Sequence, residues 1–109
     1  KITTNEFAFY LSSSPGSEAS KLTIGGYDSK YAPNGFNYVP LVSESYWMIS
    51  LGGITVGSNK IDVTGGKAIV DSGTSLLVGD NAIIEKMNPY LGTVKSDCSN
   101  LDDLPDINF

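Results

Sequence analysis

The chain contains no histidine and only one cysteine, Cys98, among its 109 residues. Without histidine, neither a Ser-His-Asp triad nor a Cys-His pair can be assembled from this sequence. A zinc site of the usual Cys/His type is excluded for the same reason. Any chemistry that this chain supports must therefore depend on carboxylates, hydroxyl groups or backbone amides.

Basic residues are also few: seven lysines or arginines stand against twelve acidic residues, which gives a formal net charge of −5. We therefore expect no nucleic-acid partner, because phosphate binding requires a basic surface. No apolar run approaches the ~20 residues that a membrane-spanning helix needs, so no membrane span is expected in this segment. The sequence starts at KITTNEF without a leader peptide, which indicates that a leader has been removed or that the chain is an interior piece of a longer one.

The residues that are abundant favour a β-rich fold. Twelve glycines, six tyrosines and scattered runs of valine, isoleucine and threonine favour strands over a helical bundle. Apolar and other residues alternate over 6–11, which predicts a strand. The polar stretch 12–20 predicts a hairpin loop, and 21–28 predicts the returning strand.

The second half of the chain predicts more short strands and one helix. Residues 46–63 predict two or three short strands, and 67–71 predict the next one. Asp80 is a suitable N-cap for a helix that begins directly after it, because its side chain can accept a hydrogen bond from a backbone amide. Pro89 and Gly92 are expected to bound that helix.

Residues 68–79, AIVDSGTSLLVG, place one acid and several small hydroxyl residues between two apolar runs, each of which we expect to be a strand. This pattern predicts that Asp71 is partly buried, which costs free energy unless the carboxylate is hydrogen-bonded or shares its charge. Gly73 permits a sharp turn that points its amide at the carboxylate, and Ser72 and Thr74 offer hydroxyl donors. The same residues also fit an ordinary turn at a strand end, in which the acid only satisfies local amides.

The longer segment resembles the second active-site sequence of pepsin-like aspartic proteases, in which two hydrophobic residues precede Asp-Thr/Ser-Gly-Thr/Ser-Ser. The pieces FAFYLSSS, KLTIGGYDSKY, FNYVPLVSESYWMISLGGITVG and LPDINF resemble successive parts of the C-terminal lobe of the same family, in order and at similar spacing. The resemblance implies a mainly β fold, half of a bilobal pepsin-like acid protease, with sheets and one short helix. Residues 1–109 would be a single fragment of the C-terminal lobe, with the N-terminal lobe and the end of the C-terminal lobe absent.

The resemblance implies a role for each residue of the motif. Asp71 corresponds to the catalytic aspartate of this lobe. Ser72 occupies the position whose hydroxyl braces the two lobes against each other. Gly73 supplies an amide beside the carboxylates, and Thr74 supplies the hydroxyl that donates to the outer oxygen of the aspartate.

Residues outside the Asp-Ser-Gly-Thr core are also implied. Ser75 and Tyr46 correspond to positions near the substrate in relatives, whereas Trp47 and Met48 are expected to pack in the core. Cys98 corresponds to a cysteine that pairs with a downstream one in relatives, so its disulfide partner would lie beyond residue 109. A buried free thiol that packs as a small hydrophobic side chain is the alternative for this residue.

The function implied by the resemblance is that of an aspartic endopeptidase that needs no metal and no cofactor. Two aspartates share one proton: the ionised one takes a proton from the attacking water, and the protonated one polarises the peptide carbonyl. The second aspartate and the flap tyrosine belong to the N-terminal lobe, so the implied partners are that lobe and a protein or peptide substrate. A secreted or acidic vesicular compartment, such as a lysosome or vacuole, is implied as well.

Two other functions remain open from the sequence. A retroviral-type protease of similar length would build its aspartate pair by homodimerisation, although the order of the other segments argues against it. A pepsin-like binding protein or inhibitor without catalysis is the second alternative. The intact Asp-Ser-Gly-Thr sequence opposes this alternative without excluding it, because the catalytic residues could have been lost from the other lobe.

Overall fold

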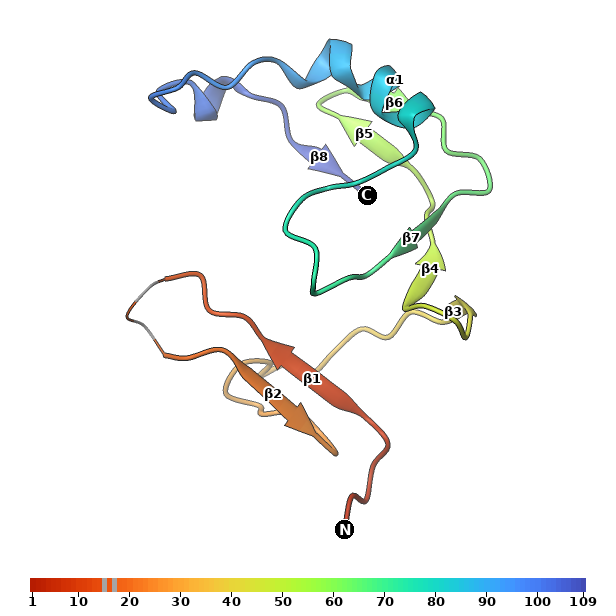
Figure 1. Ribbon diagram of the computed structural model, residues 1–109, viewed down its shortest axis with the longest axis vertical. Coiled ribbons are helices and arrows are strands. Elements are labelled where there is room, and N and C mark those ends of the chain that lie inside the picture. The colour runs from red at the N-terminus through yellow and green to blue at the C-terminus, as the bar shows by residue number, and fades with distance from the viewer. Residues whose placement is uncertain (15, 17) are drawn as a thin grey trace. The chain divides into compact units, whose positions relative to one another are not determined.

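The computed structural model describes residues 1–14, 16 and 18–109 (Figure 1). These residues form two compact units, Lys1–Tyr38 and Val39–Phe109. Eight strands and one α-helix occur in the described residues, so this part of the chain is mainly β, as the sequence predicts. No helix within the described ranges is long and apolar enough to cross a membrane.

The first unit is a β-hairpin followed by a loop. Strand β1 (Phe7–Tyr10) pairs antiparallel with strand β2 (Lys21–Ile24), which confirms both predicted strands in a shorter form. Residues 12–20 connect them, as expected for a hairpin. Pro15 and Ser17, which belong to this predicted hairpin loop, lie outside the described residues.

The two faces of the hairpin differ in character. Side chains of a strand alternate between faces, so the register places the pairs Phe7↔Ile24 and Phe9↔Leu22 on one apolar face. The two phenylalanine rings meet edge to face, with their centroids 5.9 Å apart. All four side chains of these pairs are exposed.

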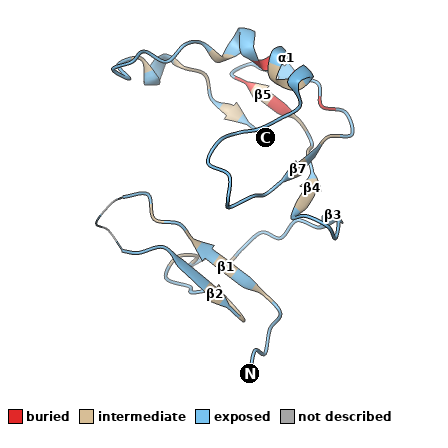
Figure 2. Cartoon of the chain, in the orientation of Figure 1, coloured by how far each residue is buried: buried red, intermediate tan, exposed pale blue. Residues whose placement is uncertain are grey.

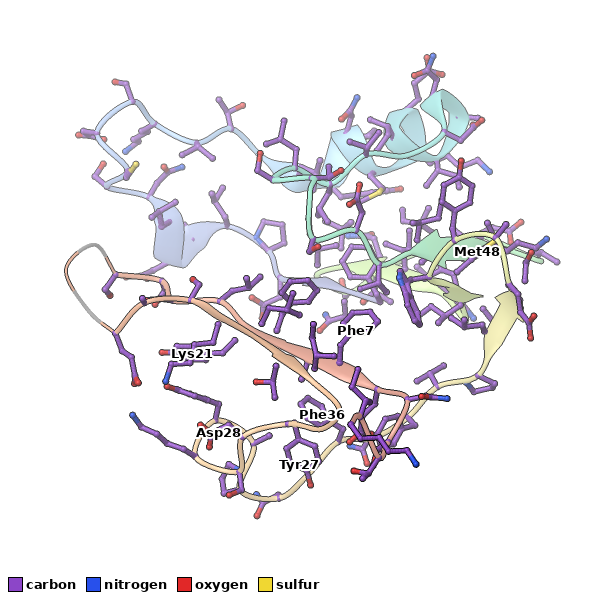
Figure 3. The ribbon with its side chains drawn as sticks, turned by 60° about the horizontal axis from the view of Figure 1, so that its bottom comes forward. Phe7, Lys21, Tyr27, Asp28, Phe36 and Met48 are labelled. Carbon is purple, nitrogen blue, oxygen red and sulfur yellow. The ribbon has the colours of Figure 1, made fainter. Side chains whose placement is uncertain are left out.

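On the opposite face of the hairpin, aromatic and ionic contacts connect the strands to the loop that follows β2. Lys21, at the centre of these contacts, is labelled in Figure 3. The rings of Tyr10 and Tyr31 stack with centroids 3.9 Å apart. The ammonium group of Lys21 donates to the Tyr31 hydroxyl at 2.7 Å and to Glu18 at 2.9 Å. Lys30 pairs with the other oxygen of Glu18 at 2.6 Å, and this hydrogen bond is the largest cause that lowers the pKa of Glu18 to about 2.

The loop itself is shaped by a turn and an aromatic pair. The side chain of Asp28 accepts a hydrogen bond from the Lys30 amide at 2.9 Å, and its carbonyl accepts one from the Tyr31 amide at 3.1 Å. Tyr27 and Phe36, labelled in Figure 3, meet edge to face with centroids 5.0 Å apart. These contacts fold residues after β2 back without a further strand.

The second unit contains two three-stranded sheets. The first has the order β3 (Leu41–Ser43), β4 (Met48–Ser50) and β7 (Lys67–Ile69), all antiparallel. The pairing of β4 and β7 extends one step past the strands, because the Val70 amide donates to the Trp47 carbonyl at 2.9 Å. This step holds the end of β7 beside the turn that precedes β4.

The second sheet carries the helix. Its order is β6-β5-β8, again antiparallel, and α1 packs against β5 and β6 (Figure 1). The remaining elements of the unit are β5 (Ile54–Val56), β6 (Asn59–Ile61), α1 (Asn81–Leu91), a 3₁₀ turn η1 (Leu101–Asp103) and β8 (Ile107–Asn108).

The core of the second unit lies between this sheet and the helix. Figure 2 shows buried positions on β5 and on α1. Each fully buried aliphatic side chain contributes about 1.5–3 kcal/mol to folding, so these few residues hold the unit together. The buried hydrophobic residues are Ile54, Val56, Ile61, Val63 and Met87.

Helix α1 begins after Asp80 and ends before Gly92, as the sequence predicts. The carboxylate of Asp80 accepts a hydrogen bond from the Ala82 amide at 2.8 Å, which confirms the predicted N-cap. Gly92 caps its C-terminal end, which confirms one of the two predicted bounds, whereas Pro89 is not a bound, because the helix continues past it to Leu91. Leu91 packs on the core, which favours two more helical residues despite the hydrogen bond that proline removes.

Two predictions about apolar segments are also wrong. Residues 76–79, expected to form a strand after the Asp-Ser-Gly-Thr segment, are exposed coil and pair with no described strand. Trp47, expected in the core, is 55% exposed, because it belongs to the turn before β4 rather than to the strand. Met48, the first residue of β4, is half-buried.

Candidate active site

The candidate site is the loop of residues 70–80, which joins β7 to α1 (Figure 1). Asp71 lies two residues after the last residue of β7, beside the hydrogen bond between the Val70 amide and the Trp47 carbonyl. The sheet therefore fixes the entry to the loop, and the cap at Asp80 fixes its exit.

Both carboxylate oxygens of Asp71 receive a hydrogen bond from the residues that follow. The Gly73 amide donates to Oδ1 at 2.8 Å, and the Thr74 hydroxyl donates to Oδ2. The Thr74 amide also donates to the Asp71 carbonyl at 3.4 Å, which closes the turn. The Thr74 hydroxyl, and after it the Gly73 amide, hold the pKa of the Asp71 carboxyl below its usual range.

Glycine at position 73 leaves room for this close approach. A Cβ added to Gly73 would lie 3.2 Å from Oδ1 of Asp71, closer than such atoms normally come. A side chain here would therefore push against the same oxygen that the Gly73 amide must reach.

The prediction that Asp71 is partly buried is wrong for this chain. Asp71 is exposed, as are all the residues of the loop from 71 to 80. The residues that follow the motif are exposed coil as well. The hydroxyls of Ser72 and Ser75 are exposed too and make no hydrogen bond within the described part of the chain.

Local hydrogen bonds alone do not distinguish Asp71 from other acids. The pKa of Asp62 is lowered by the hydroxyl and then the amide of Thr64, and the pKa of Asp97 is lowered by Ser99. Three acids of the second unit thus have the chemistry of an ordinary hydrogen-bonded turn. A feature beyond the turn is needed to mark one of them as functional.

That feature is a hollow of about 680 Å³ on the second unit, which Asp71 borders and Asp62 and Asp97 do not. The pairing of β4 with β7 brings Tyr46 and Asp71 together there, although they are 25 positions apart in the sequence. The sequence predicts roles for both residues, places Trp47 in the core instead, and does not predict the other lining residues. The pairing of the segment before β4 with the end of β7 could have indicated that these residues lie together. The other main lining residues are Leu41, Glu44, Trp47, Ile69 and Val70.

Two further features bear on the chemistry. No group of three or more histidine, cysteine, aspartate or glutamate side chains that could hold a metal occurs among the described residues. Cys98 is exposed, which removes the alternative of a buried thiol, and as the only cysteine it has no partner within this sequence. Its disulfide with a residue beyond 109 stays a prediction.

The sequence of this chain is similar to known proteins along its whole length. The family model described as eukaryotic aspartyl protease matches residues 1–109. Cathepsin E of Cavia porcellus is 39% identical over 110 residues, which cover 94% of this chain and 28% of that protein. Cathepsin D of Clupea harengus is 36% identical over 118 residues, which cover 100% and 30%. Pepsin A of Sus scrofa is 39% identical over 116 residues, which cover 99% and 30%. The chain spans about three-tenths of the length of these relatives.

Proposed function

Since the chain belongs to the eukaryotic aspartyl protease family, we propose that Asp71 is one of two catalytic aspartates in an endopeptidase that hydrolyses peptide bonds of proteins. The single observation that carries this proposal is the setting of Asp71. Its carboxylate is hydrogen-bonded through both oxygens and borders a hollow large enough for part of a peptide.

The chemistry follows from the charge of this carboxylate. The donors from Gly73 and Thr74 stabilise the ionised form, which can take a proton from a water molecule that attacks the peptide carbonyl. The same carboxylate cannot also polarise the carbonyl oxygen as an acid, so a second carboxyl group must face it. Asp71 is the only aspartate of this sequence followed by Ser-Gly or Thr-Gly. The second aspartate therefore belongs to the N-terminal lobe of the same enzyme, which makes residues 1–109 part of the C-terminal lobe.

The neighbouring residues take supporting roles. Gly73 and Thr74 position and charge Asp71 through their hydrogen bonds. Ser72, whose hydroxyl is exposed and makes no bond in the described chain, is free to brace the other lobe. Tyr46 in the hollow and the exposed Ser75 contact the peptide substrate.

The compartment and the disulfide belong to the same proposal. The relatives are named as cathepsins and pepsins, which supports a secreted or acidic vesicular enzyme. In such an oxidising setting the exposed thiol of Cys98 forms a disulfide with a cysteine beyond residue 109. Mass spectrometry of the non-reduced, alkylated full-length protein tests this, and a freely alkylated Cys98 would contradict it.

The proposed function is tested by Asp71→Asn in the full-length protein. The amide is nearly isosteric but cannot take a proton from water, so peptide cleavage in acidic buffer should fall by ~10²–10⁴-fold. Asp62→Asn is the matched control, because Asp62 has the same kind of turn but does not border the hollow. More than about 1% residual turnover in Asp71→Asn rejects the catalytic role. An unsubstituted protein that binds peptides but cleaves none would instead be a binding protein.

A further inference from the structure

The hollow beside Asp71 has apolar walls and an acidic rim. Leu41, Ile69 and Val70 supply aliphatic surface, and Trp47 adds an aromatic ring. No lysine lines the hollow, and the sequence contains no arginine, so the charge along this surface is negative only. Such a surface accepts apolar groups in its walls and favours cations at its rim.

Glu44 is the acid of this rim that is left without a partner. It lies in the turn between β3 and β4, is exposed, and makes no hydrogen bond or ion pair with any described residue. Both oxygens of Asp71, in contrast, already accept hydrogen bonds from within its own loop. A cation that enters the hollow therefore finds one carboxylate, that of Glu44, with all its acceptor capacity available.

We infer that this hollow binds a lysine-type side chain of the peptide substrate, with its aliphatic stem on the apolar walls and its ammonium group at Glu44. A lysine stem buries methylene groups along apolar surface while its charged end reaches toward water and a counter-charge. The ring of Trp47 adds the attraction of an aromatic face for a cation. A glutamate side chain would be repelled, and norleucine would gain only the apolar contact. The inference deepens the proposed function, because it assigns substrate specificity to the site of Asp71.

The position of the only tryptophan allows a direct binding test. Trp47 lines the hollow and is the only tryptophan of the sequence, so its fluorescence reports on this surface alone. The 109-residue chain is titrated at low salt with capped Ala-X-Ala peptides in which X is lysine, norleucine or glutamate. We expect a saturable change with the lysine peptide, at a Kd about three- to fivefold below that of the norleucine peptide, as for one exposed ion pair. The glutamate peptide should not saturate, and added salt should remove the advantage of lysine.

The variant Glu44→Gln separates charge from shape. It should bring the lysine peptide to the same Kd as the norleucine peptide, whereas the matched control Glu85→Gln, on the exposed side of α1, should keep the difference. Equal binding of lysine and norleucine to the unsubstituted chain, an unchanged preference in Glu44→Gln, or no saturable fluorescence change with the lysine peptide would each overturn the inference. Circular dichroism of each variant verifies that the fold is retained.

The outcome is independent of catalysis. Fluorescence binding needs no turnover, so a confirmed lysine preference together with full activity of Asp71→Asn would reject the proposed function and keep the binding site. The reverse result would keep the catalytic role and reject the specificity. In the full-length protein the same preference should appear as a higher kcat/KM for lysine than for norleucine peptides, and Glu44→Gln should abolish the difference.

Discussion

The carboxylate of Asp71 is kept in its charged form by the two residues that follow within one turn. The hydroxyl of Thr74 and the amide of Gly73 each satisfy one oxygen, and together they lower the pKa of the group. A general base must be ionised to act, and a lowered pKa extends that condition to more acidic solution. The turn therefore keeps the Asp71 carboxyl ionised, and able to accept a proton, at a pH at which an ordinary carboxyl would begin to be protonated.

Thr74→Val tests this at the level of one hydrogen bond. The change keeps the shape but removes the donor, so the pKa of Asp71 should rise toward its ordinary value of 3.8. Because the folded pKa lies below the unfolded one, the hydrogen bond stabilises the fold above the unfolded pKa, and this contribution is lost as the pH falls through the folded pKa. The variant should lack that contribution at neutral pH.

A carbon-13 NMR titration of the Asp71 carboxyl measures the effect. The matched control is Thr64→Val, which removes the corresponding hydroxyl donor from Asp62 and should shift the pKa of that group alone. An Asp71 midpoint that is the same in Thr74→Val and in the unsubstituted chain would show that the hydroxyl does not support the carboxylate.

Gly73→Ala tests the close approach in the turn. The added Cβ would lie 3.2 Å from Oδ1 of Asp71, so the carboxylate must shift by a few tenths of an ångström. Because small displacements at a reacting group are costly, peptide cleavage by the full-length protein should fall on the order of ten- to a hundredfold. Gly52→Ala is the matched control, since nothing lies within 4 Å of a Cβ there and activity should persist. Equal activity of the two variants would contradict the steric argument.

Helix α1 fixes the far end of the candidate active-site loop and carries Met87, the helical residue that is buried in the core. Met87 is 5% exposed and packs with β5 and β6 residues, whereas Glu85 on the same helix is exposed. The helix therefore depends on tertiary packing more than on its own sequence, which includes the unfavourable Pro89.

Met87→Ala should lower the free energy of unfolding by about 2–4 kcal/mol, through lost burial and the cavity left behind. Urea unfolding followed by circular dichroism measures this difference. Glu85→Ala, which alters an exposed position of the same helix, should change stability by less than about 0.5 kcal/mol. A loss below about 1 kcal/mol for Met87→Ala would show that α1 does not hold the core together.

For the whole molecule, the proposed function assigns this chain one carboxylate of a catalytic pair. The chain covers about three-tenths of its curated relatives and contains the Asp-Ser-Gly motif once. We therefore expect the isolated 109-residue chain to cleave no peptide in acidic buffer, because one carboxylate cannot serve as base and acid on the same carbonyl. Activity that rises with the square of chain concentration would instead show that two copies build the pair, as in a homodimeric protease.

Large apolar side chains remain exposed in both units. Phe7 and Phe9 lie on the apolar face of the hairpin, and Leu76, Leu77 and Val78 follow the Asp-Ser-Gly-Thr segment. Clusters of exposed apolar residues of this kind mark surfaces that contact other protein segments. Asp71 and the rest of its loop to Asp80 are exposed too.

The sequence by itself determined what depends on short separations along the chain. The hydrogen bonds of Asp71 come from residues two and three positions away, so the spacing of Asp-Ser-Gly-Thr encodes them. The cap of Asp80 on α1 is equally local, since its partner is two residues on. Alternation of apolar residues fixed the hairpin strands for the same reason.

Only the tertiary structure decided which distant segments meet. Pairing of β4 with β7 places Tyr46 and Glu44 around the hollow of Asp71 and leaves Trp47 exposed at its wall. Packing of the helix end on the core overrides the local preference of Pro89. These outcomes depend on strand pairing and burial between residues that are far apart in the sequence. A local pattern of residue types does not determine the free energy of such contacts.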